Sequence, residues 1–125
     1  MREILFRGKR IDTKEWVKGS YIYAHKWNWD GSAGHLICDI YGVNKTQVIA
    51  ETVGQYTNLT DKKGKEIFVG DILKNKWGDL YLVVEETRRI VLKGKNNHIH
   101  TWKYAHSYEI VGNIFDNKEL LGENK

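Results

Sequence analysis

The chain has 125 residues, of which 20 are basic and 16 acidic, and it contains one cysteine and no proline. A chain of this length fits one domain with a single core that is stable without cross-links. The lone Cys38 excludes an intramolecular disulfide, which fits a reducing cytosol. No segment approaches the roughly 20 apolar residues that cross a bilayer, and the charged N-terminus lacks a signal-type apolar run. We therefore expect one cytoplasmic domain over residues 1–125.

Short runs of alternating apolar and polar residues, separated by Gly, Asn and Asp, follow one another along the chain. We expect strands at residues 3–7, 16–23, 35–41, 46–49, 72–77, 80–85, 88–93, 97–103 and 107–115. Irregular structure with one short helical turn is expected at residues 51–68, and a second helical turn at 117–121. Five tryptophans and seven tyrosines favour strands. The pattern predicts a mainly β fold, an antiparallel barrel or roll with long loops and at most short helical turns.

Turn-forming residues are concentrated at residues 55–73. Asn58 and Gly64 adopt positive φ at low cost, and the Asp61 side chain can accept a hydrogen bond from backbone two residues on. We expect a tight corner at Gly70 and Asp71, where the Asp71 carboxylate accepts backbone N–H groups rather than acting in catalysis. These positions are predicted to be structural, and the set is Asn58, Gly64, Gly70, Asp71 and Gly112.

Four stretches of the sequence resemble the YopX-type family of phage and prophage proteins. They lie at residues 2–10, 15–19, 53–73 and 108–117 and span the chain in the family's order. Asn58 stands where the family usually has glycine, and Lys118 where it often has proline; asparagine tolerates the left-handed conformation that glycine would adopt. The resemblance implies a small β-barrel related to SH3-like rolls, encoded by a phage or prophage, and brings no established activity.

The excess of positive charge lies in residues 74–106, which hold 7 basic and 3 acidic residues. Basic side chains interleaved with aromatic ones are typical of single-stranded nucleic acid grooves, where cations contact phosphates and rings stack on bases. The favoured alternative is a lysine-rich sheet edge that resists aggregation, with its aromatic residues in the core. The candidate nucleic-acid residues are Lys76, Arg88, Arg89, Lys93, Lys103, Trp77 and Trp102.

Three histidines close in sequence, His98, His100 and His106, are the candidates for a metal site. His98 and His100 project from one face if the segment is a strand, but neither a carboxylate nor a cysteine is placed to complete a zinc site. We favour imidazoles that are solvated or satisfied within the core. No phosphate loop, nucleophile elbow or two-histidine metalloprotease helix is present, so no cofactor and no enzymatic activity are expected.

Trp27 and Trp29 lie in the connection at residues 24–34 and share one face if that segment is extended. Exposed tryptophans are frequent anchors of protein interfaces, but both rings could also fold back to cap the barrel. Self-association through a free strand edge at residues 36–41 is a further expectation. We therefore predict a non-catalytic binding module for a protein partner or a second copy, with weak nucleic-acid binding as the alternative.

Overall fold

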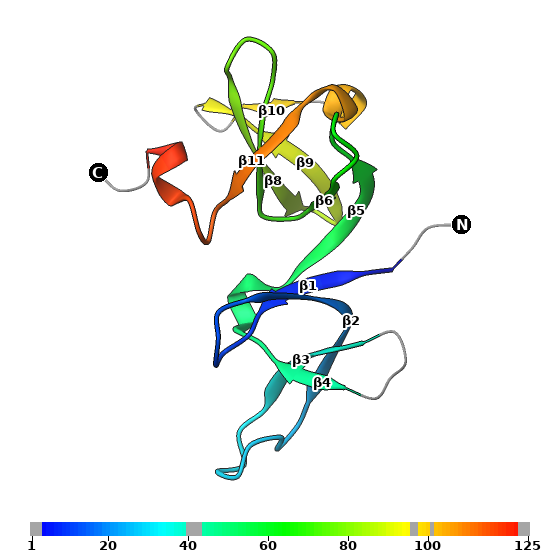
Figure 1. Cartoon of the computed structure of the whole chain (residues 1–125), viewed down its shortest axis with the longest axis vertical. Helices are drawn as coiled ribbons and strands as arrows, with labels where there is room; N and C mark the ends of the chain where they lie inside the picture. Colours follow the sequence, from blue (N-terminus) through cyan, green and yellow to red (C-terminus); the bar gives the residue numbers. More distant parts are fainter. Residues whose placement is uncertain (1–3, 40–43, 96–97, 101, 123–125) are drawn as a thin grey trace. The chain divides into compact units, whose positions relative to one another are not determined.

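The computed structural model describes residues 4–39, 44–95, 98–100 and 102–122 (Figure 1). The chain forms two compact units, Met1–Tyr56 (unit 1) and Thr57–Lys125 (unit 2), and each is described by itself. One folding domain over residues 1–125 stays a prediction. In the described residues no helix is both long and apolar enough to pass through a bilayer.

The protein is mainly β. The strands are β1 (Phe6–Lys9), β2 (Trp16–Ala24), β3 (Gly34–Cys38), β4 (Lys45–Gln47), β5 (Gly54–Thr60), β6 (Glu66–Phe68), β7 (Asp71–Lys74), β8 (Leu80–Glu86), β9 (Arg89–Lys93), β10 (Ile99–His100) and β11 (Glu109–Asn113). The short 3₁₀ turns are η1 (Ala50–Thr52), η3 (Trp102–Ser107) and η4 (Lys118–Leu121). These turns confirm the expectation of short helical turns only, and η4 lies where one was predicted.

Unit 1 is an antiparallel sheet in the order β4-β3-β2-β1-β5. Its buried apolar side chains come largely from β3, where Leu36, Ile37 and Cys38 are at most 5% exposed. Gly19 of β2 lies so close to β3 that a Cβ atom there would be 2.0 Å from the carbonyl oxygen of Cys38. Only glycine fits this close approach of the paired strands β2 and β3.

Two expectations for this region are wrong. Residues 54–60 form the strand β5, whose first residues pair with β1 through Phe6 and Gln55, although irregular structure was expected there. Tertiary pairing overrides the polar, turn-rich composition of the segment. The second error concerns the free edge expected at residues 36–41. Residues 36–38 lie in β3 between β2 and β4 and offer no free edge, and residues 40 and 41 lie outside the described residues.

In unit 2, a five-stranded antiparallel sheet has the order β10-β9-β8-β7-β11, and the later residues of β5 neighbour β6. The β8–β9 hairpin closes through Thr87 and Arg88, which both have positive φ, 51° and 65°. That geometry matches the twist of the two strands, as in a type I′ turn. Over the residues that the structure describes, neither sheet closes into a barrel; the edge strands β10 and β11 are not paired with each other.

One apolar cluster forms the centre of unit 2. Its fully or nearly fully buried members are Ile67, Leu73, Tyr81, Val83, Leu92 and Ala105. Tyr81 and Val83 alternate along β8, and Leu73 of β7 and Leu92 of β9 lie on the neighbouring strands, so that one face of the sheet points into the cluster. The Tyr81 ring stacks on Tyr108 with centroids 5.4 Å apart. The side chain of Tyr81 thus connects the cluster to the segment that precedes β11.

The residues predicted as structural turns lie in unit 2, where Gly64 and Gly70 are in turns, whereas Asn58 and Gly112 lie within the strands β5 and β11. Asn58, Gly64 and Gly70 have φ values of 68°, 81° and 101°. The Asp71 carboxylate accepts the N–H of Phe68 at 2.8 Å, which confirms its predicted role as an acceptor. Gly112 follows a register shift in the β7–β11 pairing, and a Cβ atom there would lie 2.5 Å from the Asn117 side chain.

Candidate functional site

The connection between β2 and β3 displays a tryptophan to solvent. Trp29 is fully exposed and Trp27 is 46% exposed. The backbone is held in this conformation from within: Asn28 Nδ2 donates to the Oγ of Ser32 at 3.0 Å and to the Ala33 carbonyl at 3.2 Å. The predicted alternative, in which both rings fold back on the core, is wrong for Trp29.

Asp30 supplies a second set of bonds within the same loop. Its Oδ1 accepts the backbone N–H of Ser32 at 2.9 Å and the Ser32 hydroxyl at 2.7 Å. These bonds from Ser32 lower the pKa of the Asp30 carboxyl. The carboxylate therefore stays charged at neutral pH and keeps the loop ordered around Trp29.

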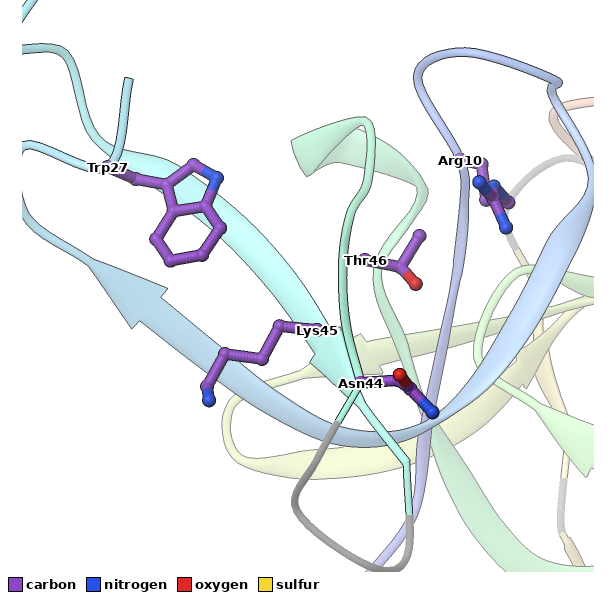
Figure 2. A pocket seen from close by; sticks show the side chains of 5 residues that line it. All are labelled: Arg10, Trp27, Asn44, Lys45 and Thr46. Carbon is purple, nitrogen blue, oxygen red and sulfur yellow. The ribbon is translucent and has the colours of Figure 1, made fainter. Parts of the chain in front are cut away.

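Trp27 borders an open hollow of unit 1 (Figure 2). The hollow has a volume of about 710 Å³ and is lined by Arg10, Trp27, Asn44, Lys45 and Thr46. Gly34 leaves room for the indole, because a Cβ atom there would be 2.7 Å from the Trp27 ring. In Figure 2 the Lys45 side chain extends to the side of Trp27, whereas Asn44 and Thr46 point to the side of Arg10.

The two cations of the hollow differ in their partners. Arg10 forms a two-pronged ion pair with Asp12, with both N···O distances at 2.9 Å, and the hydrogen bond from Arg10 lowers the pKa of Asp12 to about 2. Lys45 is exposed, and among the described residues no carboxylate forms an ion pair with it. Lys45 is therefore the cation that this surface offers to a ligand.

The structure divides the candidate nucleic-acid residues of unit 2 between two turns. Lys76 and Trp77 lie in the turn before β8, whereas Arg88 and Arg89 lie at the turn after it. In Figure 1 these two turns lie at opposite ends of β8, whose 7 residues span about 20 Å at ~3.3 Å per residue. Lys93 forms an ion pair with Glu86. The side chains of Lys103 and Trp102 lie outside the described residues.

Lys76 and Trp77 form a compact pair. Trp77 is 74% exposed, and the Lys76 ammonium lies 4.6 Å from the centroid of its ring. This contact is a cation–π interaction on the surface of unit 2. Of the residues predicted to bind nucleic acid, these two are the ones that the described structure brings into contact as a cation and a ring.

His98 and His100 approach each other on β10 and next to it, with ring centroids 6.0 Å apart. His100 also packs against Tyr81 at 4.6 Å, edge to face, and His106 is exposed in η3. In the described part of the chain no three His, Cys, Asp or Glu side chains are grouped to hold a metal ion. The structure assigns His100 a packing contact.

Sequence reasoning did not identify the residues that line the hollow beside Trp27. Arg10 and Thr46 come from strands or turns that meet only when β4 joins β3 and Arg10 bridges to Val48. It also missed Asn75, whose buried side chain organises the turn that carries Trp77. The signal for Asn75 was present, since an asparagine at the first position of a turn that a glycine closes, here Gly78, is a typical Asx position.

The two antiparallel sheets and the exposed tryptophans on turns describe a small, mainly β protein. A family model described as YopX protein matches residues 5–122. The chain therefore belongs to the YopX family, which confirms the resemblance seen in its motifs. A comparison with curated proteins found no match.

Proposed function

We propose that this protein is a non-catalytic binding module, encoded by a phage or prophage, which contacts a protein partner through Trp29 and Trp27. The observation that carries the proposal is the full exposure of Trp29 on a loop whose own hydrogen bonds fix its conformation. A fully exposed indole contributes no burial to the fold. Its large apolar area is instead available to an interface, where tryptophan is among the most effective anchors.

Order in the loop supports tight binding. A partner that docks on a flexible loop must offset the loss of conformational freedom in that loop, which weakens association. Here the loop is ordered by hydrogen bonds of Asn28 and Asp30 to Ser32, so less freedom is lost on binding. The hollow next to Trp27, with the exposed Lys45, gives the partner a place for a complementary side chain.

A different protein is favoured over a second copy of this chain. Residues 36–38, which were expected to add strands of another copy, already pair on both sides within unit 1. Light scattering of the purified protein tests this point. A monomer is expected, and a dimer that dissociates on the Trp29→Ala change would instead identify the loop as a self-association surface.

Capture from cells tests the proposal itself. Tagged wild-type protein is recovered from the phage-carrying host, with and without nuclease, and bound proteins are compared with those of Trp29→Ala and Trp27→Ala. Trp77→Ala is the matched control, because it removes an exposed indole from unit 2. We expect a nuclease-resistant protein to be lost with Trp29→Ala and retained with Trp77→Ala; equal capture by wild type and Trp29→Ala contradicts the proposal.

We also propose an SH3-like roll for unit 2 and a location in the host cytoplasm. The roll is supported by β7, which pairs with β8 on one side and with the last strand β11 on the other. The chain of this unit thus returns to its first long strand. The location is supported by the absence of a second cysteine, which is the usage of a reducing compartment.

A further inference from the structure

A second hollow lies within unit 2, beside the turn between β7 and β8. Its volume is about 410 Å³, and it is lined by Asn75, Lys76, Trp77, Ser107 and Tyr108. The indole of Trp77 and the phenol ring of Tyr108 provide its apolar walls. A hollow with aromatic walls and few polar groups suits a flat ring.

One buried residue secures both walls. The Oδ1 of Asn75 accepts the backbone N–H of Trp77 at 3.0 Å and that of Asp79 at 2.9 Å, which fixes the turn. Its Nδ2 donates to the Tyr81 hydroxyl at 3.3 Å. The Tyr81 ring in turn stacks on Tyr108, so the hollow is preformed and attached to the core of unit 2.

Lys76 lines this hollow, and further lysines are bonded to Tyr108 and Glu109 at its wall. Lys62 donates its backbone N–H to the Tyr108 carbonyl at 2.9 Å, next to the wall. The Glu109 carboxylate is shared by Lys63 at 2.7 Å and Lys62 at 3.8 Å. The hydrogen bond from Lys63 is the main cause of its lowered pKa, with smaller contributions from the charges of Lys63, Lys62 and Lys74. The Glu109 carboxylate thus forms ion pairs with Lys62 and Lys63 and also interacts with the charge of Lys74.

Lys76 adds a fourth cation at the mouth of the hollow, where Asp79 of the same turn is the nearby acid. Asp61 and Lys65 belong to the same cluster, because the charge of Asp61 acts on Lys63 and that of Lys65 acts on Asp61. The cluster therefore holds five lysines and three carboxylates, an excess of two positive charges. Such an excess favours an anionic ligand, and the aromatic walls favour one that also carries a flat ring.

We propose that the hollow of unit 2 binds one base of a single-stranded nucleic acid, stacked on Trp77, with the adjacent phosphates near Lys76, Lys62 and Lys63. Nucleic acid is favoured over an acidic peptide because every nucleotide supplies both a flat ring for the aromatic walls of the hollow and a negative charge for its lysines. The site is separate from the Trp29 loop of unit 1 and goes beyond the protein-binding function proposed for it.

The proposal assigns base binding to only a part of the basic segment at residues 74–106. Arg88 and Arg89 are remote from the hollow along β8, so they are not part of the base site. Lys62 and Lys63, which lie outside the predicted set, are placed near the phosphates instead.

Fluorescence anisotropy with a labelled oligothymidylate tests the proposal on the full-length protein. At low salt we expect binding that weakens as salt is added, and Trp77→Ala should weaken it by about fivefold to a hundredfold, the range for one stacked base. Trp29→Ala is the matched control and should bind like wild type. Arg88→Ala should also leave the affinity within about twofold, apart from its share in general attraction.

Two outcomes overturn the proposal. One is no binding at low salt; the other is binding that Trp77→Ala leaves unchanged. A labelled polyglutamate separates bases from charge, because it carries anions without rings. Polyglutamate that binds as tightly as the oligonucleotide, and equally well to Trp77→Ala, would identify an acidic-peptide surface and also contradict the base site. Circular dichroism of each variant establishes that it is folded.

Discussion

Both units display a tryptophan on a turn that is held by an asparagine, but the two turns are anchored differently. In unit 1, Asn28 bonds only to residues of its own exposed loop. In unit 2, Asn75 is 6% exposed and its side chain reaches Tyr81 in the core cluster. The indole of Trp29 is therefore ordered locally, whereas the indole of Trp77 depends on the core beneath it.

This difference separates the two proposed functions. A loop that is ordered by its own hydrogen bonds tolerates substitution without loss of the surrounding sheet, which suits a surface for a protein partner. A turn connected to the core can keep two walls at a fixed separation, which suits a site for a flat ring.

The largest effect is expected for Gly19→Ala, which introduces a methyl group 2.0 Å from the carbonyl oxygen of Cys38. Since backbone must move, unit 1 should lose about 3 kcal/mol of stability, the upper end for overpacking. Gly31→Ala is the control. The φ of Gly31 is 88°, and no atom would lie within 4 Å of the added Cβ, so only the left-handed backbone conformation lowers stability, by about 1 kcal/mol.

Hydrogen exchange on the Gly19→Ala protein also compares the units. If residues 1–125 form one cooperative domain, β8 and β9 should lose protection together with β2 and β3. Protection that is lost only in unit 1 would contradict the single-domain prediction and show two folding units.

Asp61→Asn should have the next largest effect, and it acts on unit 2. The buried carboxylate accepts N–H groups of Lys63 and Lys65 through Oδ1 and of Ile110 through Oδ2. An amide in place of Oδ2 turns a donor toward Ile110, so we expect a loss of about 2 kcal/mol. Urea unfolding measures it, and Asp30→Asn, in the exposed loop of unit 1, should stay within ~0.5 kcal/mol.

Low pH should destabilise unit 2 partly through protonation of the Asp61 carboxylate. Burial raises the pKa of Asp61, but the backbone N–H groups of Ile110, Lys65 and Lys63 outweigh it, and the pKa lies below its ordinary value of 3.8. The unfolded chain thus binds the proton more readily, so this contribution is present above pH 3.8 and is lost as the pH falls through the lowered pKa. Asp61→Asn should unfold with a shallower dependence on pH in that range; an unchanged slope argues against this contribution.

The smallest effects are expected for the tryptophans. Trp29→Ala and Trp77→Ala should each change the free energy of unfolding by no more than about 0.5 kcal/mol, because both indoles are largely exposed. Thermal unfolding by circular dichroism checks this. A large loss for Trp29→Ala alone would mean that the loop stabilises unit 1, and its partner-binding role would then lose its main support.

Turns were the part of the fold that could be predicted best. Gly64 was expected to adopt positive φ and Gly70 to form a corner, because few residue types adopt such a conformation cheaply, and this preference acts whatever surrounds the chain. Asn58 also has the expected positive φ, although it lies in β5 and not in a turn. Strand β5 was missed for the opposite reason: its polar residues form a strand because β1 and β6 offer partners. Residues 97–103 were predicted as one strand, but β10 ends at His100 and η3 begins at Trp102.

The candidate sites depended on placement that spacing does not encode. Trp27 and Trp29 could be nominated from their loop composition, but the lining of the nearby hollow required the β3–β4 register that brings Lys45 and Thr46 beside them. In unit 2, Lys62 and Tyr108 are far apart in sequence and meet through a backbone hydrogen bond. No local sequence pattern predicts such a pairing.

The buried thiol of Cys38 is a built-in probe for the opening of unit 1. It is the single cysteine of the chain, is 5% exposed and lies in the strand that Gly19 crosses. An alkylating reagent can reach it only when β3 separates from its neighbours. The rate of labelling therefore reports the rate of local opening of this sheet. Opening of unit 1 can therefore be timed by mass spectrometry in the unaltered protein, with no probe to introduce and none to remove.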